Sequence, residues 1–335
     1  MRVLTHDSVV TLDVTGLKTI EKRKEDTIIN GFAWSDSCNW GDFLYVILPL
    51  MKTSYLSDEL LERVLAKLGF NSRPEPTPGN LRRIYSAWCR HVPFDNVRKL
   101  IHMRSGNGGP LPGSTATDFF EAWLKHGTGG TCWSGAGAFH ALLRSLGFDA
   151  VRGIGTMLVA PDLPPNHGTV RVAFGTEEFL VDCSILHGEP LPLGGNTETG
   201  VEHRAWGVRC CRRNGRWHVI WRPLHMLDGL ECRLDDFGFA HEDFQERYEQ
   251  TRGWSPFNFE LSARLNKKDR VVGIGFGKAV TLLPDGTEAA HPVTNAERRR
   301  LLIEEIGMSE EIVDRLPADM PTPPPPWSKT AMASC

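Results

Sequence analysis

Hydrophobic residues follow two different periods along the chain, and the change falls near residue 149. Before it, apolar residues recur every three or four positions, which is the spacing of amphipathic helices. This pattern predicts four helices, which begin at Ser57 and Asn80 and then cover 118–125 and 132–146. After residue 149, short apolar runs alternate with polar positions, which predicts half-buried strands. These runs are clearest at 170–172, 179–181 and 216–221.

The last part of the chain adds a hairpin and one more helix. Residues 270–283 and 287–293 are expected to pair as the two arms of the hairpin. Thr294 and Glu297 have the spacing of a capping box, so a final helix should run through Ile306. Helices followed by a series of strands indicate an α+β fold, because an alternating α/β chain would interleave the two kinds of element.

Composition excludes several classes of protein. Lys+Arg is 38 and Asp+Glu is 41 in 335 residues, a balance unsuited to a protein whose main task is binding nucleic acid. Apolar runs are shorter than the roughly 18 residues that a membrane helix needs, and the first residues lack the apolar core of a secretory signal. The eight cysteines are sparse and form no paired CxxC clusters, so we expect no metal site and a reducing, cytoplasmic compartment.

One cysteine has the surroundings of a nucleophile. Cys132 follows the glycine-rich segment 127–131 and opens the predicted helix over 132–146. The positive end of a helix dipole favours a thiolate, and glycines allow backbone N–H groups to approach the oxygen of an attacked carbonyl. The alternative is a buried thiol that only packs at the start of the helix.

A base and an orienting acid are available downstream. His167 lies just before the strand at 170–172, and Asp182 ends the strand at 179–181. Antiparallel strands lie about 5 Å apart, so a hairpin would let one imidazole nitrogen bind the carboxylate while the other faces Cys132. Taken singly, the histidine suits a surface turn and the aspartate a strand end. The order of Cys, His and Asp on a helix, a strand and a strand favours a triad.

The segments around these residues resemble the arylamine N-acetyltransferase family. The similarity rests on Gly129-Gly130-Thr131-Cys132 with its apolar helix, on Val92-Pro93-Phe94-Asp95-Asn96-Val97 upstream, on Leu180-Val181-Asp182, and on the segment from Asp243 to Phe257. It covers the chain from residue 57 to residue 316. The resemblance implies an amino-terminal helical bundle, a central antiparallel β-barrel and a carboxy-terminal α/β lid around a papain-like cysteine triad core.

This implied architecture divides the chain into five parts. We expect an extension of unknown role over 1–55, the helical bundle with the nucleophile over 56–149, the barrel with the histidine and aspartate over 150–250, the lid over 251–316, and a disordered proline-rich tail over 317–335. The extension shows only weak alternation of apolar and polar residues, so its pattern indicates no role.

The resemblance also implies a chemistry. Cys132 would be the nucleophile, His167 the base and Asp182 the residue that orients the base, in a ping-pong acyl transfer from a thioester to an amine. The expected co-substrate is an acyl-CoA or an acyl carrier protein, and the acceptor is a small-molecule amine. We expect no tightly bound cofactor, no nucleic acid and no membrane partner.

Three further residues are candidates for substrate binding. Phe94 and Trp133 would line the acyl pocket, although both also suit plain core packing, and backbone N–H groups near Gly130 would help to hold the oxyanion. Two positions beside them depart from the family pattern: Thr128 stands where the family has an arginine, and Ser134 where it has an acid. Because the arginine and the acid are both replaced by neutral residues, the change leaves no unpaired charge at these positions.

The rewritten surroundings of the triad favour an altered substrate. After Asp182 the family's Val-Gly-Phe-Gly becomes Cys183-Ser184-Ile185-Leu186, in a loop that shapes the pocket of relatives. The family also contains amide synthases that pass an acyl chain from a carrier protein to an amine, and the change fits such a role. Two alternatives stay open: a thiol hydrolase or deamidase with the same triad, and a silent binding module that kept the fold.

Overall fold

The computed structural model describes residues 56–324 apart from 107, 160–162, 196, 225 and 227, together with four short strands nearer the amino terminus. The first two strands, β1 (Arg2–Thr5) and β2 (Ser8–Thr11), form one hairpin, and β3 (Ile28–Ile29) and β4 (Phe32–Ala33) form another. The chain divides into two units, Met1–Thr53 and Ser54–Cys335. The rest of the predicted extension and residues 325–335 of the predicted tail lie outside the described residues.

Helices occupy most of the described chain up to residue 145. They are α2 (Asp58–Lys67), α3 (Pro78–His91), α4 (Val97–Ser105), α5 (Ala116–His126) and α6 (Cys132–Ser145). Ser57 begins α2 as predicted, because its side chain accepts the Leu60 N–H at 3.3 Å. The prediction that Asn80 begins the second helix is wrong. Thr77 caps α3, and Pro78, which has no N–H to satisfy, takes the first helical position.

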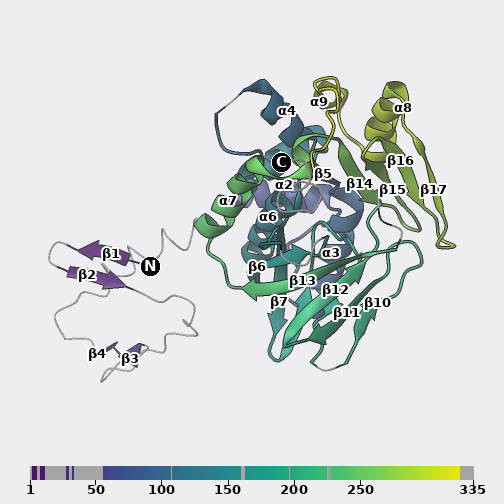
Figure 1. The fold of residues 1–335 in the computed structure, drawn as a ribbon. Coiled ribbons are helices and arrows are strands. Elements are labelled where there is room, and N and C mark those ends of the chain that lie inside the picture. The colour runs from purple at the N-terminus through teal and green to yellow at the C-terminus, as the bar shows by residue number, and fades with distance from the viewer. Residues whose placement is uncertain are drawn as a thin grey trace. The chain divides into compact units, whose positions relative to one another are not determined.

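An eight-stranded antiparallel sheet follows, in the order β10-β11-β12-β13-β6-β7-β8-β9. Its members are β6 (Asp149–Met157), β7 (His167–Phe174), β8 (Glu177–Leu180), β9 (Leu191–Pro192), β10 (Thr199–Val201), β11 (Val208–Arg213), β12 (Arg216–Trp221) and β13 (Leu230–Phe237). The end strands β9 and β10 contact each other, so the sheet curls into a nearly closed barrel. Helix α6 packs on β6 and β7, which joins the helices to the barrel (Figure 1).

A second antiparallel sheet joins distant parts of the chain in the order β17-β16-β15-β14-β5. Its members are β5 (Phe94–Asp95), β14 (Ser262–Asn266), β15 (Val271–Gly275), β16 (Lys278–Leu282) and β17 (Glu288–Pro292). The expected hairpin over 270–293 is therefore three strands, because Phe276 and Gly277, at φ 48° and 78°, make an additional turn inside its first arm. Strand β5 lies between α3 and α4 in the chain and ties this sheet to the helical layer.

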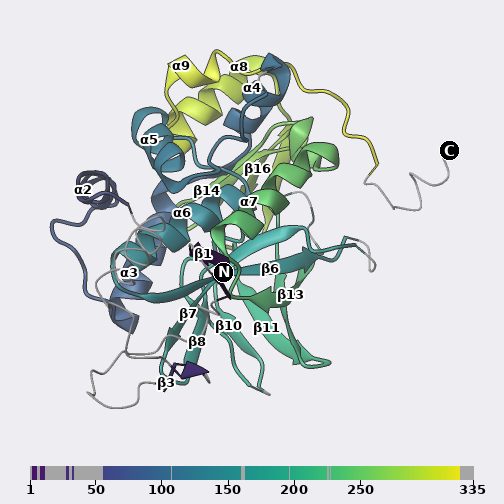
Figure 2. The same ribbon diagram turned by 90° about the vertical axis from the view of Figure 1, so that its left-hand side faces the viewer.

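Short helices connect and cover the two sheets. They are α7 (His241–Gln250), η1 (Thr251–Gly253), η2 (Pro256–Asn258), α8 (Asn295–Arg300), the π-helical turn η3 (Leu301–Ile306) and α9 (Glu310–Val313). Thr294 accepts the Glu297 N–H at 3.2 Å, as the predicted cap requires. The Glu297 carboxylate instead lies 2.8 Å from the His291 ring, so the side chain that would complete the capping box is engaged elsewhere. In Figure 2, α4, α8 and α9 gather at one end of the molecule.

Apolar side chains from the helices and the barrel form the largest core, around Trp88, Phe119 and Phe139. A second core, around Leu100, Leu261 and Leu302, lies between α4, the five-stranded sheet and the last helices. Helices followed by antiparallel sheets confirm the predicted α+β fold class. In the part of the chain that the structure describes, none of the helices has the length and apolar character needed to cross a bilayer.

Candidate active site

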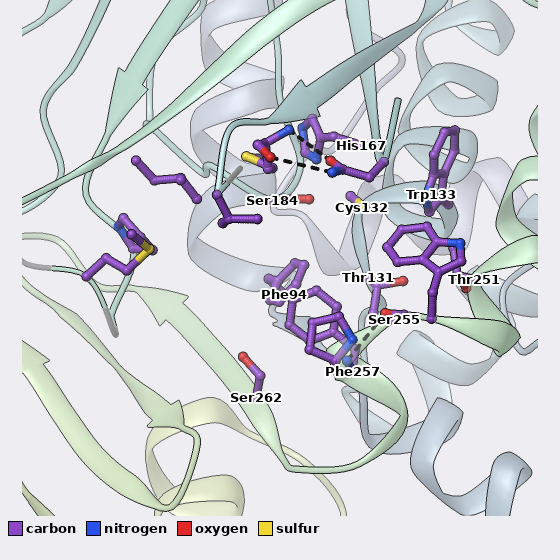
Figure 3. Close-up of a pocket in the computed structure, with 18 of the residues that line it drawn as sticks. Phe94, Thr131, Cys132, Trp133, His167, Ser184, Thr251, Ser255, Phe257 and Ser262 are labelled. Carbon is purple, nitrogen blue, oxygen red and sulfur yellow. Dashed lines mark hydrogen bonds between the residues drawn. The ribbon is translucent and has the colours of Figure 1, made fainter. Parts of the chain in front are cut away.

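A cavity of about 500 Å³ collects residues from α6, the barrel and the segment between α7 and β15 (Figure 3). Most of its wall is apolar, with aromatic side chains prominent. Among the residues that line it are Phe94, Lys99, Thr131, Cys132, Trp133, His167, Thr251, Phe257 and Arg264. The cavity therefore brings together two members of the predicted triad and the two predicted aromatic residues.

Cys132 occupies the first position of α6 and is 8% exposed. Thr131 precedes the helix in an extended conformation, and its carbonyl accepts the Gly135 N–H at 2.9 Å. The amides of the first turn that come before Gly135 have no acceptor within the helix. Together with the helix dipole, they present partial positive charge beside the sulfur, where an attacked carbonyl would develop negative charge on its oxygen.

His167 and Asp182 meet at the ends of two paired strands. His167 begins β7, and Asp182 follows β8, which pairs with β7 in an antiparallel register. The His167 Nε2 atom lies 2.6 Å from the Asp182 Oδ2 atom, and both residues are buried. The other carboxylate oxygen accepts the N–H groups of Ser184 at 2.8 Å and Ile185 at 2.9 Å. The carboxylate is thus fixed from both sides.

The charges of this pair stabilise each other. Burial by itself lowers the pKa of His167, but the Asp182 carboxylate and a hydrogen bond with Cys132 outweigh burial and raise the pKa to about 10. Burial by itself raises the pKa of Asp182, and the charge and hydrogen bond of His167 outweigh it and lower the pKa. In Figure 3, Cys132 lies close to His167. A charged ring between a carboxylate and a sulfur is the arrangement that an activated thiol needs.

The glycine loop before Cys132 is held by a buried carboxyl group. Asp95 accepts the Gly129 N–H at 2.6 Å and the Val97 N–H at 3.0 Å. Burial is the main cause that raises the pKa of Asp95 to about 6, and these backbone hydrogen bonds only partly offset it. A Cβ atom at Gly129 would collide with the Pro93 carbonyl oxygen, so the close approach of the two segments requires glycine.

Thr128 and Ser134, which replace the family's arginine and acid near the cysteine, are both buried. The Ser134 hydroxyl donates to the Thr131 carbonyl at 3.1 Å. The Thr128 hydroxyl has no partner within the described residues. Two neutral side chains at these positions leave no buried charge without its partner, as the sequence indicates.

Two of the three predicted substrate-binding residues line the cavity. Phe94 packs edge-on against Phe257 with ring centroids 5.3 Å apart, and Trp133 packs in the same way against Phe244 at 4.9 Å. Both are also part of the core, so each residue packs in the core and faces the cavity at once. Gly130 forms a bridge with Phe94 beside the cavity wall, and its role in substrate binding remains a prediction.

Among the polar residues of the cavity wall that sequence reasoning missed are Lys99 in α4, Thr251 in η1 and Arg264 in β14. The buried positions Val97 and Leu100 have helical spacing, and this signal could have revealed α4 and with it the lysine. Nothing in the local sequence of the other two residues marks them, because only the packing of η1 and β14 brings them to the cavity.

Three kinds of comparison relate this chain to known proteins. A family model described as N-acetyltransferase matches residues 79–220. An arylamine N-acetyltransferase from Mycolicibacterium smegmatis is 30% identical over 178 residues, which is 48% of this chain. The match spans 62% of the length of that curated relative.

Solved structures share the fold at lower identity. The arylamine N-acetyltransferase from Mycobacterium abscessus has a TM-score of 0.64 and 20% identity, covering 76% of this chain and 93% of that one. The Mycobacterium marinum arylamine N-acetyltransferase in complex with CoA has a TM-score of 0.65 and 19% identity, covering 76% and 96%. The family model and the curated relative confirm the resemblance to the arylamine N-acetyltransferases found in the sequence, and the solved structures show that the chain shares their fold.

Proposed function

We propose that this protein is a cysteine-dependent N-acyltransferase that moves an acyl group from a thioester to an amine. The observation that carries the proposal is the buried His167–Asp182 pair at 2.6 Å, whose ring lies close to Cys132 at the wall of the cavity (Figure 3). The family relationship supports the same chemistry, and one solved relative is a complex with CoA.

In the first half-reaction, Cys132 attacks the thioester. His167 holds the proton of the cysteine thiol, so the sulfur acts as a thiolate. A bond forms between this sulfur and the acyl carbon, while amides of the first turn of α6 stabilise the oxyanion by about 3–4 kcal/mol each. The bond to the donor sulfur then breaks. The donor leaves as a thiol with the proton from His167, and the enzyme keeps the acyl group.

In the second half-reaction, an amine takes the acyl group. Its nitrogen attacks the acyl carbon, and His167 accepts a proton from that nitrogen. The carbon–nitrogen bond forms and the bond to the Cys132 sulfur breaks, which restores the thiolate and the charged ring. Asp182 keeps the ring oriented through both steps because its carboxylate is fixed by two backbone amides.

The donor and the acceptor define the finer part of the proposal. The donor carries its acyl group as a thioester on CoA or on an acyl carrier protein, and a carrier-bound chain would make the protein an amide synthase. The loop after Asp182 contributes Ser184 to the cavity in place of the family's glycine, which supports an altered acyl pocket.

The test is turnover of a thioester with and without an amine. The enzyme is incubated with acetyl-CoA or an acetylated carrier protein, in the presence and absence of aniline, and free thiol, acetate and anilide are measured. We expect anilide to form and thiol release to accelerate with aniline. Thiol and acetate released at the same rate in both cases would instead identify a hydrolase, and no release above the uncatalysed rate would identify a silent binding module.

A further inference from the structure

Lys99 is a buried cation on the wall of the same cavity as Cys132. It lies in α4 and is 3% exposed. Its ammonium donates to the Thr251 hydroxyl at 2.8 Å and lies over the face of the Tyr248 ring, 5.8 Å from the ring centroid. Thr251 donates its own proton to the Tyr248 carbonyl at 2.7 Å, which fixes the hydroxyl as an acceptor for the lysine.

No carboxylate in the described part of the chain forms an ion pair with Lys99. Glu249 acts on the lysine from α7, but it pairs with Arg252 at 2.6 Å and also accepts the Leu111 N–H at 2.6 Å. The charge of Arg252 opposes that of Glu249 at the lysine. Because a buried charge without a partner destabilises a fold by several kcal/mol, its presence on a cavity wall indicates a ligand that supplies the opposite charge.

Arg264, a buried guanidinium on the same cavity wall, has a different environment. Its guanidinium donates to the carbonyls of Ser184 and Ile185 and lies over the Trp221 ring, 4.7 Å from the centroid. These contacts hold the loop after Asp182 and occupy the cation. The ammonium of Lys99 has three protons to donate. Among the described residues, it has one hydrogen-bond acceptor, the Thr251 hydroxyl.

We propose that Lys99 forms a carboxylate-binding subsite of the acyl-transfer cavity. The subsite favours substrates in which either the acyl donor or the amine carries a carboxylate. The inference rests on the proposed function, because it assigns this subsite to a substrate of that reaction. The carboxylate lies either on the acyl chain of the thioester or on the amine. In both cases it completes the ion pair that the fold leaves open beside the nucleophile.

The protonation of Lys99 gives this subsite a pH dependence. Burial is the main cause that lowers the pKa of Lys99 to about 7. The charged and titratable groups that face it are Cys132 from α6, Glu249 and Tyr248 from α7, and Arg252 from η1. Since the ammonium binds an anion and the neutral amine does not, selectivity for the carboxylate should be strongest below pH 7 and weaken as the pH rises above it.

The experiment compares the wild type with Lys99→Met, which keeps the length of the side chain and removes its charge. One arm uses aniline with succinyl-CoA or acetyl-CoA, and the other uses acetyl-CoA with 4-aminobenzoate or aniline. The ratio of kcat/KM for the anionic substrate to that for the neutral one is measured in each arm. We expect this ratio to fall about 10- to 100-fold in the variant in one arm, which identifies the substrate that carries the carboxylate.

The control is Lys125→Met, because Lys125 is exposed and forms a surface ion pair with Glu311. It should leave both ratios unchanged. Identical ratios in the wild type and Lys99→Met in both arms would overturn the subsite, whereas absence of transfer with every pair would count against the proposed function. A binding measurement separates the two: succinate or benzoate should raise the Tm of the wild type more than that of Lys99→Met, and an equal rise would overturn the subsite even without turnover.

Discussion

Two buried cations of the site, the His167 ring of the proposed triad and the Lys99 ammonium of the cavity wall, have opposite environments. The ring of His167 is enclosed by groups of this chain, with Asp182 at 2.6 Å and Cys132 on its other side. Lys99 shares the cavity wall with Cys132, but its ammonium contacts only neutral groups, the Thr251 hydroxyl and the face of the Tyr248 ring, among the described residues. The difference separates chemistry from recognition. Under the proposed function, this chain supplies every partner of the groups that would transfer the acyl chain, and it leaves Lys99 for a substrate carboxylate to pair with.

Removal of the Cys132 sulfur should lower the rate more than any other change. Cys132→Ala should lower kcat by at least about 10³-fold, because the acyl-enzyme cannot form. The matched control is Cys211→Ala, since Cys211 is a partly exposed free thiol on β11. Steady-state rates of amide formation check both. Activity retained in Cys132→Ala would show that the proposed triad does not transfer the acyl group.

A smaller effect is expected when the acid loses its charge. Asp182→Asn should lower kcat/KM by about 10²- to 10⁴-fold, because the ring loses the partner that holds its orientation and charge. The change is also visible by NMR. With its pKa raised to about 10, the His167 ring should keep its proton from pH 6 to 8 in the wild type. In Asp182→Asn, burial then dominates and the ring should be neutral at pH 8, whereas unchanged ring signals would contradict this role of the carboxylate.

The glycine loop offers a third test, through stability as well as rate. Gly129→Ala should lower the free energy of unfolding by about 1–3 kcal/mol, because its Cβ would collide with the Pro93 carbonyl oxygen and push the loop away from Asp95. Gly79→Ala is the control, since a Cβ atom there would meet no atom within 4 Å. Thermal unfolding of the two variants is compared, and equal Tm values would show that the loop tolerates displacement.

The weakest of these effects is expected on the stability of the fold, when the unpaired charge of Lys99 is removed. Lys99→Met should raise the Tm at pH 6 by a few degrees, because a buried cation is replaced by an apolar group of similar volume. Burial lowers the pKa of Lys99 from 10.5 to about 7, so its destabilising effect is complete below pH 7 and fades as the pH rises toward 10.5. The gain in Tm should shrink accordingly at pH 9. A lower Tm in the variant at pH 6 would mean that the lysine is paired after all.

Much of the site could be predicted from the sequence because its signals are local. Cys132 follows a glycine run at the start of an apolar helix, and His167 and Asp182 flank one hairpin. A tight hairpin fixes which residues face each other, so the pattern of strands and turns alone places the acid beside the base. The same locality explains the success at Ser57 and Thr294, whose capping side chains act on the next turn of their own helices.

The remainder depends on contacts between distant segments. Strand β5 pairs with β14, which lies far along the chain, and this pairing brings Arg264 opposite Phe94 at the cavity. Lys99 meets Thr251 at the cavity wall, although the two residues belong to elements far apart in the chain. The periodicity of the sequence does not predict these contacts, because Lys99 and Arg264 fit the patterns of their own helix and strand. The boundaries of the five predicted domains also remain predictions.

In the proposed mechanism, Cys132 carries the acyl group between donor and amine. The most direct measurement is mass spectrometry of the enzyme quenched after mixing with acetyl-CoA in the absence of amine, followed by peptide mapping. We expect one added acetyl group on the peptide that contains Cys132, and its loss when aniline is added before the quench. An unmodified Cys132 in an enzyme that still forms anilide, or an acetyl group on another residue that aniline removes, would contradict it.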